Sequence, residues 1–286
     1  MGIISPNLAA YPSDKPDKQI HLLFIHHSCG GQLLADRGEV KERSAGTRIF
    51  LTHPNGGGLR AALTRNNYAV HEASIGSRIG AATDVCHWNR KFADWMDDIL
   101  RCSGQDRLFE DSTRNAVVVF KSCFSGSLID SEGSEPGDPD SPEKTAANYR
   151  AAYRSLLASF RKQPGTLFVV FTSPPLAAPV RGIVPTLVQA VRNLLGRSGP
   201  ADEAGLRIRA FNDWLKDEDD GWLSEYELNN VVVFDYYDIL TGHGRSNWSV
   251  YPTARGKDSH PSSEGNSRAA QVFIPFLNKA VRRMDI

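Results

Sequence analysis

The sequence predicts an α/β protein in which a five-stranded, mostly parallel sheet lies between two layers of helices. Five short apolar runs occupy residues 20–25, 68–73, 116–121, 166–172 and 230–237. Three of them are nearly continuous Val, Leu and Phe, which is typical of parallel strands covered on both faces. Stretches with helical spacing separate the runs, and this alternation predicts βαβ units in a three-layer α/β/α sandwich.

The predicted helices each carry one apolar face that can cover the sheet. Helical spacing of apolar residues occurs at 57–67, 92–102, 147–165, 205–218 and 267–284. The third of these stretches ends in Pro164-Gly165, which is a helix stop signal. Pro275 is expected to kink or interrupt the last helix, because proline lacks the N–H that a helical hydrogen bond needs.

The chain is expected to form one domain over residues 20–286, preceded by a flexible lead-in at 1–19. Residues 130–145 are acidic and rich in Ser, Pro and Gly, and the alternation resumes directly after them, so they are interpreted as a surface loop. The N-terminus lacks the basic start and continuous apolar region of a complete signal peptide. A cytoplasmic location is therefore favoured, or a secreted one if this N-terminus is a processed start.

Composition excludes several classes of function. The 286 residues carry a formal net charge of +0, and the isoelectric point near 7.1 gives no electrostatic footprint for nucleic acid. No apolar run approaches the ~18 residues of a membrane span. The four cysteines form no CxxC pair, which argues against a structural zinc site. Reduced thiols are expected, although an even count also permits two disulfides.

Candidate catalytic groups follow the first apolar run, in "LLFIHHSCGGQLL" (22–34). Ser28 is a candidate nucleophile at the end of a strand, and a helix-capping role is the alternative. His26 and His27 could be metal ligands, but adjacent strand residues point to opposite faces and cannot share one ion without distortion. We expect one of them in the core or beside the site, and we predict no metal site.

Polar residues also follow the other apolar runs. They occupy 74–84, 121–127, 172–179 and 235–242, and a loop at 256–266 contains His260. Because ligands bind at the carboxyl ends of strands in open α/β sheets, these segments should meet at one edge. A serine, a histidine, a carboxylate and N–H donors are what a serine hydrolase needs.

With these residues in order, the chain resembles an SGNH (GDSL-type) hydrolase, in a branch whose first block reads His-Ser-Thr/Cys-Gly. The resemblance runs from Ile20 to about Leu277 and depends mainly on "FIHHSCGG" and "DSHPSSEGNSRAAQVFIPFLN", with weaker support from "IGAATDVCHW", "VVVFKSCFSGS" and "NNVVVFDYYDILT". It implies a flavodoxin-like five-stranded sheet, the SGNH hydrolase fold, and a serine esterase or deacylase.

The resemblance also implies residue roles. Ser28 would be the nucleophile and its own N–H an oxyanion donor, while Gly80 would supply a second N–H. His260 would be the base and Asp258 the acid that orients it. Cys29 is placed in the substrate or oxyanion region beside Ser28, with a role as the nucleophile itself as the less favoured alternative.

Two departures from the family pattern are visible. The usual DxxH motif is replaced by Asp258-Ser259-His260 with Lys257 in the expected acid position, so Asp235 and Asp238 are fallback acids. Gly126 occupies the position where relatives carry an Asn that donates a side-chain N–H to the oxyanion. The replacements considered are Ser122, Ser125, Ser127 or a backbone N–H; without one, the site loses a donor worth ~3 kcal/mol.

The resulting prediction is an esterase for a small-molecule or carbohydrate ester with a short acyl group, with no cofactor and no nucleic-acid partner. Two alternatives remain open at this point. The same triad could transfer the acyl group to an acceptor hydroxyl, as in an acyltransferase. Alternatively, the two departures could indicate a catalytically weakened binding protein on the same fold.

Overall fold

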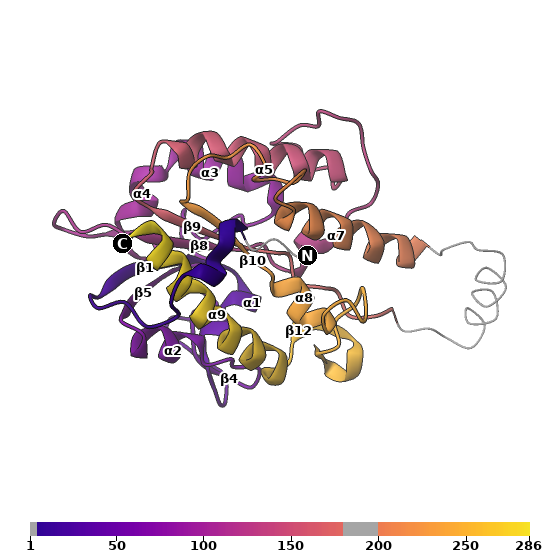
Figure 1. The fold of residues 1–286 in the computed structure, drawn as a ribbon. Coiled ribbons are helices and arrows are strands. Elements are labelled where there is room, and N and C mark those ends of the chain that lie inside the picture. Colours follow the sequence, from indigo (N-terminus) through magenta and orange to yellow (C-terminus); the bar gives the residue numbers. More distant parts are fainter. Residues whose placement is uncertain (1–4, 180–199) are drawn as a thin grey trace.

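A five-stranded parallel sheet organises the chain (Figure 1). The computed structural model describes residues 5–179 and 200–286. The strands are β1 (Ile20–Ile25), β5 (Tyr68–Ala73), β8 (Val117–Phe120), β9 (Leu167–Phe171) and β10 (Val231–Phe234). Their spatial order is β10-β9-β8-β1-β5, and every neighbouring pair is parallel. This is the flavodoxin-like order 2-1-3-4-5, so the predicted fold class is confirmed.

Helices cover both faces of the sheet, as the doubly buried strands require. One layer contains α3 (Trp88–Asp94), α4 (Met96–Arg101), α5 (Ala146–Arg161) and α7 (Pro200–Lys216). The other contains α1 (Ser28–Leu34), α2 (Leu59–Arg65), α8 (Tyr236–Thr241) and α9 (Ser263–Met284). Each face of the sheet packs against its helices in a separate hydrophobic core, and alternate strand residues point into one core or the other. Leu23 packs against the first layer and Phe24 against the second. The two layers lie on opposite sides of the sheet in Figure 1.

Two predicted elements are divided differently in the structure. The expected helix over 92–102 is broken at Trp95, whose backbone leaves the helical region (φ -123°, ψ 23°), so α3 and α4 are separate. The apolar run at 230–237 is a strand only as far as Phe234. Asp235 then caps α8 by accepting a hydrogen bond from the Asp238 N–H, and the following Tyr236 is helical.

The expected interruption of the last helix at Pro275 is not seen, because α9 runs from Ser263 to Met284 without a break. Pro275 lies on the exposed side of the helix, and so does Gln271, whose carbonyl loses its helical partner. Water can bond that carbonyl at the exposed position, so the proline is tolerated where a buried one would not be.

Several short strands and 3₁₀ turns that no apolar pattern in the sequence indicated lie outside the five-stranded sheet. They are the strands β2 (Asp36–Arg37), β3 (Lys41–Glu42), β4 (Phe50–His53), β6 (Cys102–Gly104), β7 (Arg107–Leu108), β11 (Pro252–Thr253) and β12 (Asp258–Pro261), and the 3₁₀ turns η1 (Ser5–Ala10), η2 (Val85–His87), η3 (Phe124–Ser127) and η4 (Ala254–Gly256). β2, β4 and β3 form a small sheet inserted between α1 and α2, and β11 pairs antiparallel with β12. The insertion brings His53 of β4 toward the site described below.

The two segments expected outside the regular core pack differently against it. Within the lead-in at 1–19, of which residues 1–4 lie outside the described ranges, Leu8 is buried beside α9. Residues 130–145 are irregular apart from a bridge between Ser131 and Thr145, and Glu135 within them pairs with arginines of α5. Among the described helices, none has the length and apolarity needed to cross a membrane.

Candidate active site

The topology places the carboxyl ends of β1 and β8 side by side, at the point where the strand order reverses. The chain passes from β1 to β5 on one side and then returns to β8 on the other, and this reversal of strand order is where ligands bind in open α/β sheets. Ser28 follows β1 and begins α1, while Cys123 follows β8. Their side chains meet, with Ser28 Oγ 3.6 Å from Cys123 Sγ.

Three side chains from the two ends of the chain form a continuous hydrogen-bonded array at this position. Ser28 Oγ lies 2.9 Å from His260 Nε2. On the other side of the ring, His260 Nδ1 lies 2.7 Å from Asp258 Oδ1. His260 and Asp258 come from β12, which the pairing with β11 holds beside α1. The structure thus brings together the three residues that the sequence selected.

Asp258 controls both the backbone and the ring of His260. Its Oδ1 accepts the His260 backbone N–H at 3.0 Å as well as Nδ1 at 2.7 Å. Partial burial alone would raise the pKa of this carboxyl, but the two hydrogen bonds from His260 lower it below its ordinary value. The aspartate is therefore ionised near neutral pH, and an acceptor-only carboxylate requires the ring proton on Nδ1. That leaves Nε2 as the acceptor facing Ser28.

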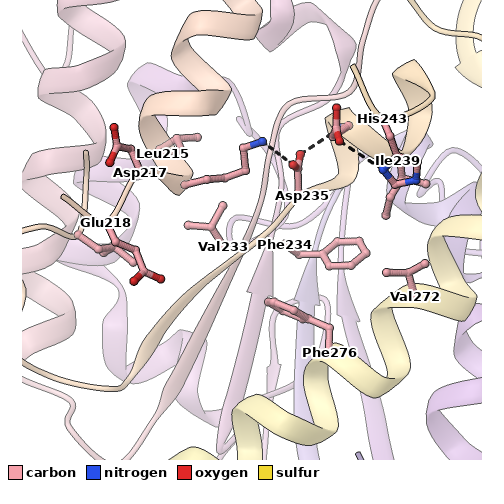
Figure 2. Close-up of a pocket in the computed structure, with 13 residues that line it drawn as sticks. Leu215, Asp217, Glu218, Val233, Phe234, Asp235, Ile239, His243, Val272 and Phe276 are labelled. Atoms are coloured by element: carbon pink, nitrogen blue, oxygen red, sulfur yellow. Dashed lines mark hydrogen bonds and ion pairs between the residues drawn. The ribbon is translucent and has the colours of Figure 1, made fainter. Parts of the chain in front are cut away.

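The fallback acids Asp235 and Asp238 lie in a different environment, shown in Figure 2. Both line a cavity of about 290 Å³ beside β10, with apolar walls that include Phe276. Asp235 pairs with Lys216, and Asp238 with His243 at 3.3 Å. These carboxylates are committed to partners around the cavity, so Asp258 is the acid associated with His260.

Gly80 has a different role from the one expected. Its N–H donates to Ser77 Oγ at 2.8 Å, so the proposed oxyanion donor is already paired within its own turn. A Cβ at this position would lie 2.0 Å from the Ser74 backbone nitrogen. Close backbone packing against Ser74 therefore explains the glycine, independently of any approaching acyl group.

Gly126, Ser125 and Ser127 have their donors engaged elsewhere and do not replace the missing asparagine side chain. The Gly126 N–H donates to the Cys123 carbonyl at 2.9 Å, and a Cβ there would lie 2.9 Å from Ser122 Cβ. The hydroxyls of Ser125 and Ser127 donate to the Asp84 carboxylate and the Pro174 carbonyl, respectively. Ser122 Oγ accepts a hydrogen bond from Trp88 Nε1, which leaves its own O–H proton uncommitted.

The two adjacent histidines separate as the strand geometry predicts. His26 is buried in the core, where Nε2 lies 3.1 Å from Glu72 Oε2 and Arg60 makes two further bonds to the same carboxylate. His27 lies beside the site, where Nε2 lies 3.1 Å from the Gly80 carbonyl oxygen. Burial lowers the pKa of His27, so its ring is neutral near pH 7.

Two residues near His260 were not identified from the sequence. The Phe124 ring packs edge-to-face on the His260 ring with centroids 5.0 Å apart. His53 of β4 is close enough to His260 for their charges to interact, and burial together with this interaction lowers the His53 pKa. No sequence signal indicated His53, because β4 belongs to the inserted sheet; Phe124 lies inside the block-three stretch "KSCFSGS".

A pair of thiols lies directly under Ser28. Cys29 Sγ and Cys123 Sγ are 3.2 Å apart, and all four cysteines are free, as the sequence favoured. The Cys29 side chain is 0% exposed and Cys123 8%. Cys29 Sγ therefore contacts Cys123 and is closed to solvent. Among the described residues, Cys29, Cys123 and His260 form a group with donor atoms within 4.8 Å of one another.

Comparison with known proteins gives distant structural likenesses. The sequence matches no protein-family model and no curated protein. The fold is similar to that of a protein assigned as an acylhydrolase from Bacteroides fragilis, at 14% identity over 96% of this chain and 95% of that one, with a TM-score of 0.45. It is also similar to an acetylxylan esterase from Geobacillus stearothermophilus, at 14% identity over 93% and 96%, with a TM-score of 0.42. A family two carbohydrate esterase from Clostridium thermocellum aligns at 14% identity over 94% and 66%, with a TM-score of 0.38.

Proposed function

We propose that the protein is a serine esterase or deacylase of the SGNH type, with Ser28 as nucleophile, His260 as base and Asp258 as the orienting acid. The observation that carries this proposal is the continuous array from Ser28 Oγ to His260 Nε2 at 2.9 Å and from His260 Nδ1 to Asp258 at 2.7 Å. Both distances are within the range needed for direct proton transfer and ring orientation.

In the first half-reaction, Ser28 Oγ attacks the ester carbonyl while its proton moves to His260 Nε2. The ring is then doubly protonated, and the adjacent Asp258 carboxylate stabilises its positive charge. Collapse of the tetrahedral intermediate breaks the bond to the alcohol oxygen, which takes the proton from Nε2 as it leaves. The acyl group remains on Ser28 as an ester.

In the second half-reaction, water replaces the alcohol. His260 Nε2 accepts a proton from water as the oxygen attacks the acyl carbonyl, and the same proton returns to Ser28 Oγ when the acid is released. The Ser28 side chain is half-buried, which leaves it accessible to water and substrate. The protein supplies all the groups that these steps require.

The oxyanion site of this proposal depends on the Ser28 backbone N–H. The Gly80 N–H is bonded to Ser77, and Gly126 brings no side-chain donor to block three. Loss of one oxyanion donor costs ~3 kcal/mol, or roughly 100-fold in rate. We therefore expect a slow esterase compared with SGNH enzymes that have the asparagine donor.

The proposed substrate is a small-molecule or carbohydrate ester with a short acyl group. This choice rests on the sequence resemblance, because one fold supports many substrates. Hydrolysis of p-nitrophenyl esters of increasing acyl length measures the acyl preference directly. Acetylated sugars with the same acyl group then test whether the alcohol part is a carbohydrate.

The decisive experiment combines turnover with labelling. Wild-type protein should hydrolyse p-nitrophenyl acetate and should be labelled at Ser28 by a fluorophosphonate, as located by peptide mass spectrometry. Ser28→Ala and His260→Ala should lose both properties, and Ser103→Ala, in the β6–β7 hairpin, provides a matched control. Hydrolysis that survives in Ser28→Ala at the wild-type rate would refute the mechanism.

A further inference from the structure

The thiol pair beneath Ser28 has the donor atoms of a site for a thiophilic cation. Cys29 Sγ and Cys123 Sγ are 3.2 Å apart, and each lies within 4.8 Å of a His260 ring nitrogen. Because Nδ1 is bonded to Asp258, Nε2 is the His260 nitrogen available on this side. A tetrahedral zinc site with Zn–S bonds of 2.3 Å separates two sulfurs by ~3.8 Å. Small side-chain adjustments would therefore produce that geometry.

Backbone N–H groups support both sulfurs. The Phe124 N–H donates to Cys29 Sγ, and the Cys29 N–H donates to Cys123 Sγ. Lys121 is buried close by, with Nζ bonded to the Ser122 carbonyl oxygen at 2.9 Å. Hydrogen bonds to a ligand atom are the support that metal ligands require around them.

We propose that Cys29 Sγ, Cys123 Sγ and His260 Nε2 form a binding site for a thiophilic divalent cation, with Zn²⁺ as its biological occupant. Binding releases the two thiol protons to solvent and forms two metal–sulfur bonds and one metal–nitrogen bond. Two thiolates and one imidazole are ligands that Zn²⁺ accepts. Ser28 Oγ lies 2.9 Å from Nε2 and 3.6 Å from Cys123 Sγ, close enough to supply a fourth, oxygen ligand.

This site and the proposed catalysis are mutually exclusive, a consequence that rests on the proposed function. His260 Nε2 is the atom that accepts the Ser28 proton, and a metal ion bound there removes that acceptor. The cation would therefore act as a reversible inhibitor of ester hydrolysis. Cys29 and Cys123 would make the inhibition selective for thiophilic ions over Mg²⁺ or Ca²⁺, which prefer oxygen ligands.

The test measures binding separately from activity. Cd²⁺ is titrated into the full-length protein kept reduced with a phosphine, and the thiolate-to-Cd²⁺ charge-transfer absorption is recorded. We expect a band that saturates at one ion per chain and is displaced by Zn²⁺. Cys29→Ser and Cys123→Ser should each weaken this binding at least ~10-fold, since even changes outside the ligand sphere cost that much. Cys86→Ser, in η2 and outside the group, should bind as wild type.

Two further variants keep the result interpretable. His260→Gln retains both thiols, so its band should remain while its Zn²⁺ affinity falls by about tenfold or more. Cys29→Ala is a second substitution at the fully buried position, and near-ultraviolet circular dichroism of each variant establishes that it is folded. A missing band in wild type, or an equal band in folded Cys29 and Cys123 variants, would overturn the metal site.

Activity then distinguishes the two proposals. Zn²⁺ should inhibit wild-type p-nitrophenyl acetate hydrolysis, EDTA should restore it, and Cys123→Ser should need at least ~10-fold more Zn²⁺ for the same fractional loss. A cysteine-dependent band in a protein without esterase activity would refute the proposed function and support the metal site. Esterase activity with Ser28 labelling but no cysteine-dependent band would do the reverse.

Discussion

Two of the histidine–carboxylate pairs in this fold, His26–Glu72 and His260–Asp258, differ in environment and in proposed role. His26 Nε2 lies 3.1 Å from Glu72 Oε2, with side chains that are 0% and 3% exposed. His260 Nδ1 lies 2.7 Å from Asp258 Oδ1, with side chains that are 19% and 42% exposed. The first pair joins the residue after β1 to the edge strand β5, and the second lies beside Ser28 at the start of α1.

The difference lies in the second ring nitrogen. His26 Nδ1 lies 2.9 Å from the His27 carbonyl oxygen, and Arg60 neutralises the charge of Glu72, so every polar atom of this pair is held by the protein. His260 Nε2 instead faces a serine hydroxyl. The same two chemical groups therefore serve structure where both nitrogens are satisfied, and proposed catalysis where one nitrogen faces a nucleophile.

The largest expected effect is on activity at the exposed pair. His260→Gln should reduce kcat/KM by about 10⁴-fold or more, because the proton acceptor is lost. His26→Gln should keep kcat/KM within about tenfold of wild type, since this ring does not face Ser28. Steady-state kinetics on both folded variants measures the contrast. Equal losses in the two variants would contradict the assignment of separate roles.

Asp258→Asn should have the next largest effect. The amide can no longer accept the Nδ1 proton as a carboxylate does, so the tautomer and the charge stabilisation are both compromised, and kcat should fall by roughly 10²–10⁴-fold. Asp235→Asn and Asp238→Asn are matched controls beside the cavity in Figure 2 and should retain activity. If either control lost more activity than Asp258→Asn, the acid would be reassigned.

Glu72→Gln should affect stability instead of catalysis. Removing one partner of a buried ionic group costs about 3–5 kcal/mol, here because Arg60 loses its counter-charge and only one of the two acceptor oxygens shared by Arg60 and His26 remains. Urea unfolding should show this loss, while fluorophosphonate labelling of Ser28 in the folded variant should proceed at close to the wild-type rate. A stability change below ~1 kcal/mol would mean that the network is largely compensated.

The smallest expected effect is the acid dependence of stability. Burial raises the Glu72 pKa, but hydrogen bonds and charges from His26 and Arg60 more than offset this and lower it below 4.5. A carboxyl group whose pKa is lower in the folded state than in the unfolded state stabilises the fold at any pH above the unfolded-state pKa. This stabilisation is lost as the pH falls through the folded-state pKa. Unfolding free energy should therefore fall between about pH 5 and 3, less steeply in Glu72→Gln. Asp258→Asn should change this slope less, because its side chain is 42% exposed.

The five-stranded sheet was predictable because its strands are short runs rich in apolar residues, and the fold buries these residues between two layers of helices. The strands Val117–Phe120 and Leu167–Phe171 are apolar on both faces, and the structure places them side by side and parallel with Val117 opposite Leu167. The break at Trp95 and the continuity at Pro275 were not predictable from periodicity. Both depend on which partners the backbone N–H and C=O groups find for their hydrogen bonds in the folded chain. The spacing of apolar residues carries no information about those partners.

The site was predictable to the extent that motif chemistry is local. Ser28, His260 and Asp258 stand at the ends of recognisable blocks, and the structure brings them together. The pairing of the Gly80 N–H with Ser77 depends on a turn geometry that the motif does not specify. The contact between Cys29 and Cys123 depends on two strands that are neighbours only in the folded sheet.

His260 donates two hydrogen bonds to Asp258, which makes the proposed acid and base a self-contained unit within three consecutive residues. Because Oδ1 accepts both the backbone N–H and the Nδ1 proton of His260, displacement of this segment would carry the pair along intact. Motion of β12 would thus change the separation between Nε2 and Ser28 Oγ while the contact between Asp258 and His260 stayed the same.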